Sequence, residues 1–169
     1  APAFSITSEN CWILSVLAEA GILYDCSIFP TSRSFGGFPE YKSKFPCKIE
    51  IDGVSIKEFP IAPSTIWRRE IVYSGGGYFR IFTYSKIKSL TAESNYVMSY
   101  FQIKDFDKEQ KRRFATLEGE SAFTRYFKNY VDLNSCFKKF TRYISDFDFC
   151  SVKEADAEIN WEELPAIRL

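Results

Sequence analysis

The chain has 169 residues, of which 46% are hydrophobic and 18% aromatic, so it can bury a core and is not a disordered chain. Lys plus Arg and Asp plus Glu both number 22, so no net charge favours nucleic acid or an anionic membrane, and no apolar run is long enough to span a bilayer. The absence of histidine excludes a Ser-His-Asp or Cys-His nucleophile and a histidine-rich metal site built from this chain alone.

The cysteines are widely spaced and form no Cys-x-x-Cys pair: Cys11, Cys26, Cys47, Cys136 and Cys150. Their odd number and lack of ligand spacing indicate buried free thiols rather than a disulfide framework or a zinc site. Free thiols are typical of a reducing compartment, and the N-terminus lacks the pattern of a signal peptide. We therefore expect a cytoplasmic location, with the cell envelope as the alternative.

The first predicted elements are a helix and a short strand. Residues 7–10 supply N-cap candidates, apolar residues follow at helical spacing, and Gly21 ends the pattern, which predicts a helix over residues 8–20. Residues 22–30 are β-prone but are interrupted by Asp25, where a strand would end. Asp25 is either a site residue or a loop aspartate that caps nearby amides.

A long loop and a hairpin follow. Residues 30–46 are rich in Ser, Gly, Pro and aromatic residues, which predicts an irregular loop within a domain. Residues 47–51 and 54–57 alternate apolar with polar on either side of Asp52-Gly53, a preferred two-residue turn, so they predict a β-hairpin. The chain is expected to leave the sheet at residues 58–61.

Three consecutive glycines, Gly75 to Gly77, are flanked by aromatic residues and followed by Arg80; we call residues 75–77 the glycine run. One interpretation is a ligand-contacting loop, in which exposed amides, Tyr78, Phe79 and Arg80 bind a sugar or an anionic group. The other is a tight turn, which the residues alone favour because no phosphate-binding pattern accompanies the run.

The second half of the chain is predicted to be largely helical and aromatic. A helix is expected over residues 84–90 and a buried strand over 96–101, ending at Gln102, with aspartates at 105 and 107 in either a ligand-binding or a solvated loop. Aromatic stripes at residues 123–131 and 137–144 predict two helices joined at 132–134, with the aromatic side chains in the core. A last strand is expected over 147–152, and the acidic residues 154–163 are expected to be peripheral or frayed.

Read together, residues 1–7, 24–30, 58–60 and 74–80 resemble the second half of a NodB-like polysaccharide deacetylase, in the branch associated with exopolysaccharide and exosortase gene clusters. The resemblance implies an α/β fold: the C-terminal portion of a distorted (β/α)7 barrel, with a β-hairpin insertion and a helical C-terminal extension. It assigns residues 1–152 to the deacetylase-like domain with its extension and leaves 153–169 as an acidic tail.

The family reaction is the metal-dependent removal of N- or O-acetyl groups from a glycan. A divalent metal, usually zinc, activates water, an aspartate is the general base, and a histidine protonates the leaving group. The metal ligands and base belong to N-terminal motifs that this sequence lacks, so the resemblance implies a fragment that binds no metal alone and needs the missing N-terminal half as its partner.

The resemblance also implies roles for particular residues. Pro2 belongs to an Arg-x-Pro motif whose arginine would precede Ala1, and Asp25 corresponds to the aspartate that orients this arginine. Gln102 stands where relatives carry the general-acid histidine. The glycine run with Tyr78, Phe79 and Arg80 would line the glycan cleft.

Two functional hypotheses follow from these residues. The first is that the chain is part of an active carbohydrate deacetylase that acts on acetylated polysaccharide. The second, favoured by Gln102, is a catalytically inactive deacetylase-like module that binds a glycan or a protein.

Overall fold

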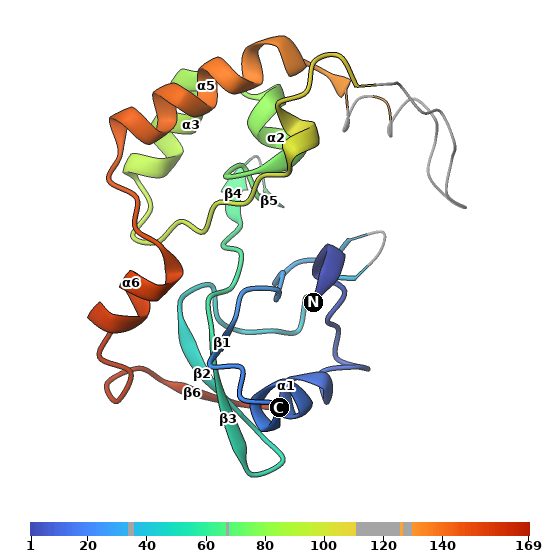
Figure 1. The fold of residues 1–169 in the computed structure, drawn as a ribbon, viewed down its shortest axis with the longest axis vertical. Coiled ribbons are helices and arrows are strands. Elements are labelled where there is room, and N and C mark those ends of the chain that lie inside the picture. Colours follow the sequence, from blue (N-terminus) through green and yellow to red (C-terminus); the bar gives the residue numbers. More distant parts are fainter. Residues whose placement is uncertain (34–35, 67, 111–125, 127–129) are drawn as a thin grey trace. The chain divides into compact units, whose positions relative to one another are not determined.

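The structure, a computed structural model, describes residues 1–33, 36–66, 68–110, 126 and 130–169. The chain forms two compact units (Figure 1). Unit 1 comprises Ala1–Pro63 and Cys150–Leu169, and unit 2 comprises Ser64–Phe149. Both units contain helices and strands, so the expected α/β class is confirmed, whereas the barrel of the resemblance stays a prediction.

Unit 1 is built on a four-stranded mixed sheet with the order β1-β3-β2-β6. Its strands are β1 (Tyr24–Asp25), β2 (Cys47–Ile51), β3 (Val54–Glu58) and β6 (Ala166–Arg168). β2 and β3 are antiparallel, while β1 runs parallel to β3 and β6 runs parallel to β2. The predicted hairpin is confirmed, although β3 extends to Glu58 rather than leaving the sheet before it.

The hairpin turn and the strand alternation explain why these residues form the sheet. Asp52 and Gly53 both have positive φ, of 49° and 80°, the combination that matches the twist of a two-residue hairpin. Alternate residues of β2 point into the core with Ile56 of β3: Cys47, Ile49 and Ile51. The packed residues of the opposite layer include Ile6, Leu14 and Ile28.

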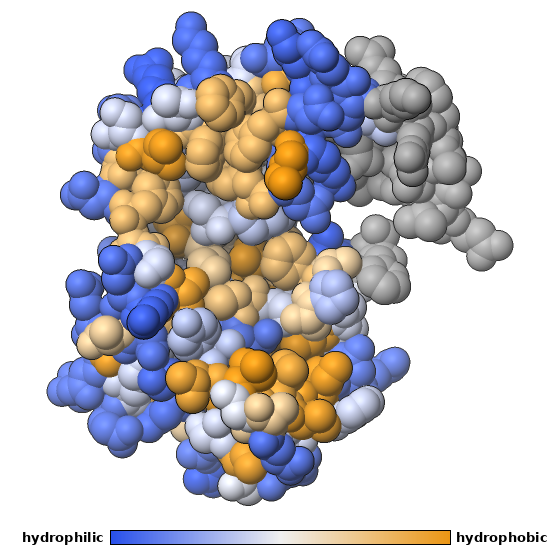
Figure 2. Space-filling model, in the orientation of Figure 1, coloured by the Kyte–Doolittle hydropathy of each residue, from blue (hydrophilic) through white to orange (hydrophobic). Residues whose placement is uncertain are grey.

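Before the hairpin, unit 1 contains a 3-10 turn, η1 (Pro2–Phe4), and a short helix, α1 (Ile13–Glu19). The helix predicted from residue 8 begins later, because the Asn10 side chain accepts a hydrogen bond from the Thr7 amide at 2.7 Å and closes a turn there. Described residues between 30 and 46 form the expected loop. Apolar residues gather on the surface over α1 (Figure 2), where Val16, Ile22 and Leu23 are exposed.

The C-terminal residues of unit 1 form regular elements rather than a frayed segment, while the helix among them has no buried residue, as expected of a peripheral one. The strand expected over 147–152 is absent from the described structure, and α6 (Val152–Glu158) begins there with Ser151 as its N-cap. Trp161 is 8% exposed and packs edge-on against Phe59, with ring centroids 5.4 Å apart. β6 then adds the fourth strand of the sheet.

Unit 2 has a small sheet and a helical layer. β4 (Ser64–Ile66) and β5 (Arg69–Ile71) form an antiparallel pair that the residue pattern did not predict. The helical elements are α2 (Gly76–Ile81), α3 (Tyr84–Ala92), η2 (Ile103–Asp105) and α5 (Leu133–Asp146). α3 and α5 confirm two predicted helices, and Asp132 occupies the N-cap position of α5 without a side-chain capping bond.

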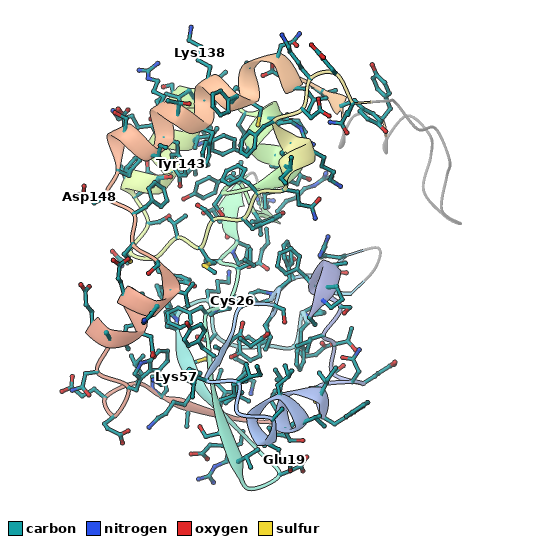
Figure 3. The ribbon with its side chains drawn as sticks, in the orientation of Figure 1. Glu19, Cys26, Lys57, Lys138, Tyr143 and Asp148 are labelled. Carbon is teal, nitrogen blue, oxygen red and sulfur yellow. The ribbon has the colours of Figure 1, made fainter. Side chains whose placement is uncertain are left out.

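The core of unit 2 is aromatic, as predicted, but α5 contributes a different face. Its buried residues are Leu133, Cys136 and Tyr143, whereas Phe137 and Ile144 of the predicted stripe are 61% and 49% exposed. Figure 3 shows Tyr143 on the inner side of α5 and Lys138 on the outer side. Most of the stripe predicted at 123–131 lies outside the described residues; the rings of Tyr126 and Tyr130 are 5.4 Å apart.

The prediction of a strand over residues 96–101 is wrong. Within residues 96–101, only Tyr100 forms a β-bridge, an isolated parallel one to Gly75. Phe101 instead packs its ring against Phe79, Phe106 and Phe140. All five cysteines are free thiols; Cys47 and Cys136 are buried as predicted, whereas Cys11 and Cys26 are partly buried and Cys150 is exposed. Among the described helices, none has the length and apolar character needed to cross a membrane.

Candidate functional site

Asp25 lies at the end of β1, in unit 1, and is 8% exposed. Its Oδ2 accepts two hydrogen bonds from Ser27, one from the amide at 3.0 Å and one from the hydroxyl at 2.6 Å. The Asp25 carbonyl accepts a third bond from the Phe59 amide at 3.0 Å. Asp25 therefore has a fixed side chain that caps a nearby amide, in agreement with one of its two interpretations.

Glu58 faces Asp25 across the sheet, because the parallel register of β1 and β3 pairs these two residues. Its side chain is fully buried, and Oε1 accepts a hydrogen bond from the Ile28 amide at 3.2 Å. Burial raises the pKa of Glu58 well above its ordinary value, and the adjacent Asp25 charge and hydrogen bond raise it further. The pKa of Glu58 is therefore held above that of Asp25.

The same environment keeps Asp25 ionised. Burial alone would raise its pKa, but the hydrogen bonds from Ser27 and from Glu58 outweigh burial, and the pKa of Asp25 is lowered. Burial, with the nearby charges of Glu58 and Asp25, also raises the pKa of the Cys26 thiol to about 12. The result is a buried carboxyl pair whose two pKa values are moved in opposite directions, beside a thiol whose pKa is raised.

Glu58 was not among the predicted site residues. The signal that identifies it is the strand alternation: Ile56 points inward, so residue 58, two positions later, also points inward. A carboxyl group at an inward position is rare unless it has a specific partner. The sequence pattern could have shown the inward position, but the register with β1 was needed to show the partner.

The N-terminal turn lies next to Asp25. The Ala1 main-chain nitrogen is 3.6 Å from Asp25 Oδ1, and Pro2 begins η1. Ala3 and Phe4 both have left-handed φ values, 56° and 55°, which are costly for residues other than glycine. Arg33 holds this turn, because its Nη1 donates to the Ala3 carbonyl at 2.9 Å and its guanidinium stacks 5.3 Å from the Phe4 ring centroid.

In unit 2, the glycine run is explained mainly by backbone geometry. A Cβ on Gly75 would lie 2.1 Å from the Tyr100 carbonyl oxygen, so only glycine permits the bridge between these residues. Gly76 has φ of +53° and starts α2. The Ser74 hydroxyl, just before the run, donates to the Met98 carbonyl at 2.7 Å. These contacts join the glycine run to residues 98–100.

The residues that follow the glycine run differ in exposure. Tyr78 is 43% exposed and remains available for a ligand. Phe79 is fully buried and packs edge-on against Phe101, with ring centroids 4.9 Å apart. Arg80 is 2% exposed and forms an ion pair with Asp105. Within unit 2, Phe79 and Arg80 therefore face the interior of the unit, and glycan contact stays a prediction for Tyr78 and the main chain.

Gln102 is exposed and precedes η2. The main-chain amide of Gln102 donates a hydrogen bond to Asp105 Oδ2 at 2.9 Å, and the main-chain carbonyl of Gln102 accepts one from the main-chain amide of Asp105 at 2.8 Å. The next residue, Ile103, is 90% exposed. Residue 102 thus has a fixed main chain and a solvent-facing side chain. Asp25 and Pro2 belong to unit 1, and the other predicted site residues are brought together in unit 2.

The described residues do not fit a zinc site. They contain no cluster of three or more Cys, Asp or Glu side chains placed to hold a metal ion. The carboxyl groups of Asp25 and Glu58 come from paired strands, but Asp25 Oδ2 accepts two hydrogen bonds from Ser27 and Glu58 Oε1 accepts one from the Ile28 amide. This pair is therefore arranged to hold its neighbours in place rather than to ligate a cation.

Comparison with known proteins identifies one family. A family model described as "Domain of unknown function (DUF3473)" matches residues 26–157, which include the hairpin, the glycine run and Gln102. No curated protein and no solved structure matches the chain.

Proposed function

This chain belongs to the DUF3473 family, and from that premise we propose that it is part of a carbohydrate deacetylase. The longer protein would hydrolyse N- or O-acetyl groups on a polysaccharide, and a segment preceding Ala1 would supply the metal ligands and the general base. Within unit 1, Asp25 would orient an arginine of the preceding segment, and within unit 2, Tyr78 and Gln102 would contact the glycan.

The observation that carries the proposal is the contact between Ala1 and Asp25. The resemblance implies that Asp25 orients an arginine placed immediately before Ala1. The Ala1 nitrogen lies 3.6 Å from Asp25 Oδ1, so a residue attached to Ala1 would begin beside this carboxylate. Asp25 is ionised and held by Ser27, which suits a partner with a permanent positive charge.

Unit 2 supports the proposal through residue 102 and Tyr78. The main chain of Gln102 is fixed while its side chain faces solvent, as expected of a residue that reaches a substrate. Tyr78 offers an exposed ring, and sugars present an apolar face to such rings.

The second candidate is an inactive module that binds glycan without hydrolysing it, and Gln102 is the observation in its favour. A glutamine amide can hold a substrate oxygen by hydrogen bonding, but it cannot donate a proton to a leaving group near neutral pH. Both candidates require glycan binding, and they differ only in acetate release.

The experiment measures both quantities on the full-length protein with acetylated and chemically deacetylated samples of the same polysaccharide. An active enzyme releases acetate from the acetylated sample, whereas the inactive module binds it without release. A full-length protein that neither binds the polysaccharide nor releases acetate would contradict both candidates.

A further inference from the structure

The buried ion pair between Arg80 and Asp105 connects two segments of unit 2 that carry predicted site residues. Arg80 comes from α2, which begins in the glycine run, and Asp105 ends η2. Their side chains are 3% and 4% exposed. Asp105 divides its two oxygens, because Oδ1 meets Arg80 Nη1 and Oδ2 accepts from the Gln102 amide.

An ion pair that is buried this completely contributes little to the free energy of unfolding. Removing both charges from water costs several kcal/mol for each ion, so apolar side chains of similar size often serve a core equally well. The surrounding core is aromatic, with Phe79, Phe101 and Phe106 close by in ring contacts, and such side chains would suit the space. What the pair adds is directional: Arg80 fixes Oδ1 of Asp105, which leaves Oδ2 placed to accept a hydrogen bond from the main-chain amide of Gln102.

The Arg80 end of the pair is itself anchored. The Lys139 ammonium, on α5, donates to the Arg80 carbonyl and, at 2.9 Å, to the Phe82 carbonyl. Lys139 also pairs with Asp132 at 2.7 Å. These bonds hold the C-terminal turn of α2 against α5, so the guanidinium has a fixed origin from which it orients Asp105.

We propose that Arg80 and Asp105 are positioning residues that fix the main chain of residue 102, and so aim its side chain at the substrate. The inference rests on the proposed function for the role of residue 102. It also gives Arg80 a role other than direct glycan contact: Arg80 orients Asp105, Asp105 holds the Gln102 amide, and the exposed side chain of residue 102 meets the ligand.

The first test isolates the hydrogen bond, using amide exchange of the full-length protein. Asp105→Asn keeps the shape of the side chain but turns one acceptor oxygen into a donor, so Arg80 and the Gln102 amide can no longer both be satisfied. We expect the residue 102 amide to exchange about tenfold faster or more, because a bond to a charged acceptor is lost. Asp107→Asn is the matched control, since Asp107 is exposed and its Oδ1 accepts a hydrogen bond from the Glu109 amide, two residues away.

The second test measures the consequence for catalysis in the Gln102→His background, where residue 102 can act as an acid. Adding Asp105→Asn should lower kcat by about tenfold, and Asp105→Glu should restore part of it, while the fraction of folded protein is monitored. A loss of acetate release that only follows the loss of folded protein would overturn the positioning role.

The outcomes separate the inference from the proposed function. If the Gln102→His protein releases no acetate, the deacetylase proposal fails, and amide exchange still decides whether Asp105 holds residue 102. Equal exchange at residue 102 in the Asp105→Asn and Asp107→Asn proteins would overturn the inference.

Discussion

Replacement of Gly75 by alanine tests whether the glycine run exists to allow close backbone contact. The added Cβ would lie 2.1 Å from the carbonyl oxygen of Tyr100 and 2.8 Å from Cδ1 of the Tyr100 ring. Ordinary van der Waals contacts of a Cβ begin near 3.4 Å. The two segments would have to separate by roughly 1 Å, which removes the bridge between residues 75 and 100. Overpacking of this kind costs about 1–3 kcal/mol, and the lower chain entropy of unfolded alanine offsets at most about 1 kcal/mol of it.

We therefore expect Gly75→Ala to destabilise unit 2 by about 1–2 kcal/mol. Native-state hydrogen exchange is the suitable assay, because amides of α3 report on unit 2 and amides of β2 report on unit 1. Gly77→Ala is the matched control: Gly77 lies within α2, and helix propensity alone predicts a gain of up to about 1 kcal/mol. Unchanged α3 exchange in Gly75→Ala, or the same change in both variants, would refute the explanation.

Three further predictions follow from the two units. Glu58→Gln should remove a pH dependence of stability. Because the pKa of Glu58 is raised by folding, its contribution to stability is complete below its ordinary pKa of 4.5 and is lost as the pH rises through the folded-state pKa. In urea unfolding between pH 5 and pH 9, the free energy of unfolding of the wild type should therefore fall more than that of the variant, and an equal fall in both would count against a raised pKa of Glu58. Tyr78→Ala should weaken oligosaccharide binding by the full-length protein about three- to tenfold at unchanged melting temperature, since the ring is 43% exposed; unchanged affinity would remove Tyr78 from the glycan site. Calorimetric titration of this chain with zinc should show no stoichiometric sub-micromolar binding, and such binding would contradict the assignment of the metal ligands to a preceding segment.

The elements that were predicted correctly are those with a local cause. The β2–β3 hairpin follows from alternation on both sides of Asp52-Gly53, whose backbone adopts the positive φ values that this turn requires. The α3 helix has Thr83 as its N-cap, with the hydroxyl accepting from the Lys86 amide. Such signals are contained within a few residues, so the sequence alone is sufficient.

The elements that were missed depend on distant partners. β6 is a strand because Ile167 pairs with Ile49, far away along the chain, and nothing in the acidic segment before it indicates that pairing. Residues 96–101 have the composition of a buried strand, yet Phe101 is used in an aromatic cluster instead of a sheet. The composition of a segment indicates that it is buried, but it does not indicate which other segment it packs against.

The residues of the candidate site show the same difference between local signals and distant partners. Asp25 was identified from its position at a strand end and from the resemblance, and Gln102 from the resemblance. Glu58 was not a predicted site residue, and Asp105 was expected in a ligand-binding or solvated loop, whereas it is 3% exposed and paired with Arg80. Each of these two carboxyl groups acquires its function from a partner in another segment: Glu58 from the register of β1 and β3, and Asp105 from Arg80 on α2. Buried carboxyl groups are therefore the residues whose roles most needed the structure.

The most direct test of the deacetylase proposal is acetate release by the full-length protein and its Gln102→His variant. A positioned general acid typically contributes ~10²–10⁴-fold to rate. If a preceding segment supplies the metal ligands and base, the histidine variant should release acetate from acetylated polysaccharide at least about tenfold faster than the wild type, with a new pH dependence from the imidazolium. A wild-type protein as fast as its histidine variant would contradict the assignment of residue 102 to the general-acid position.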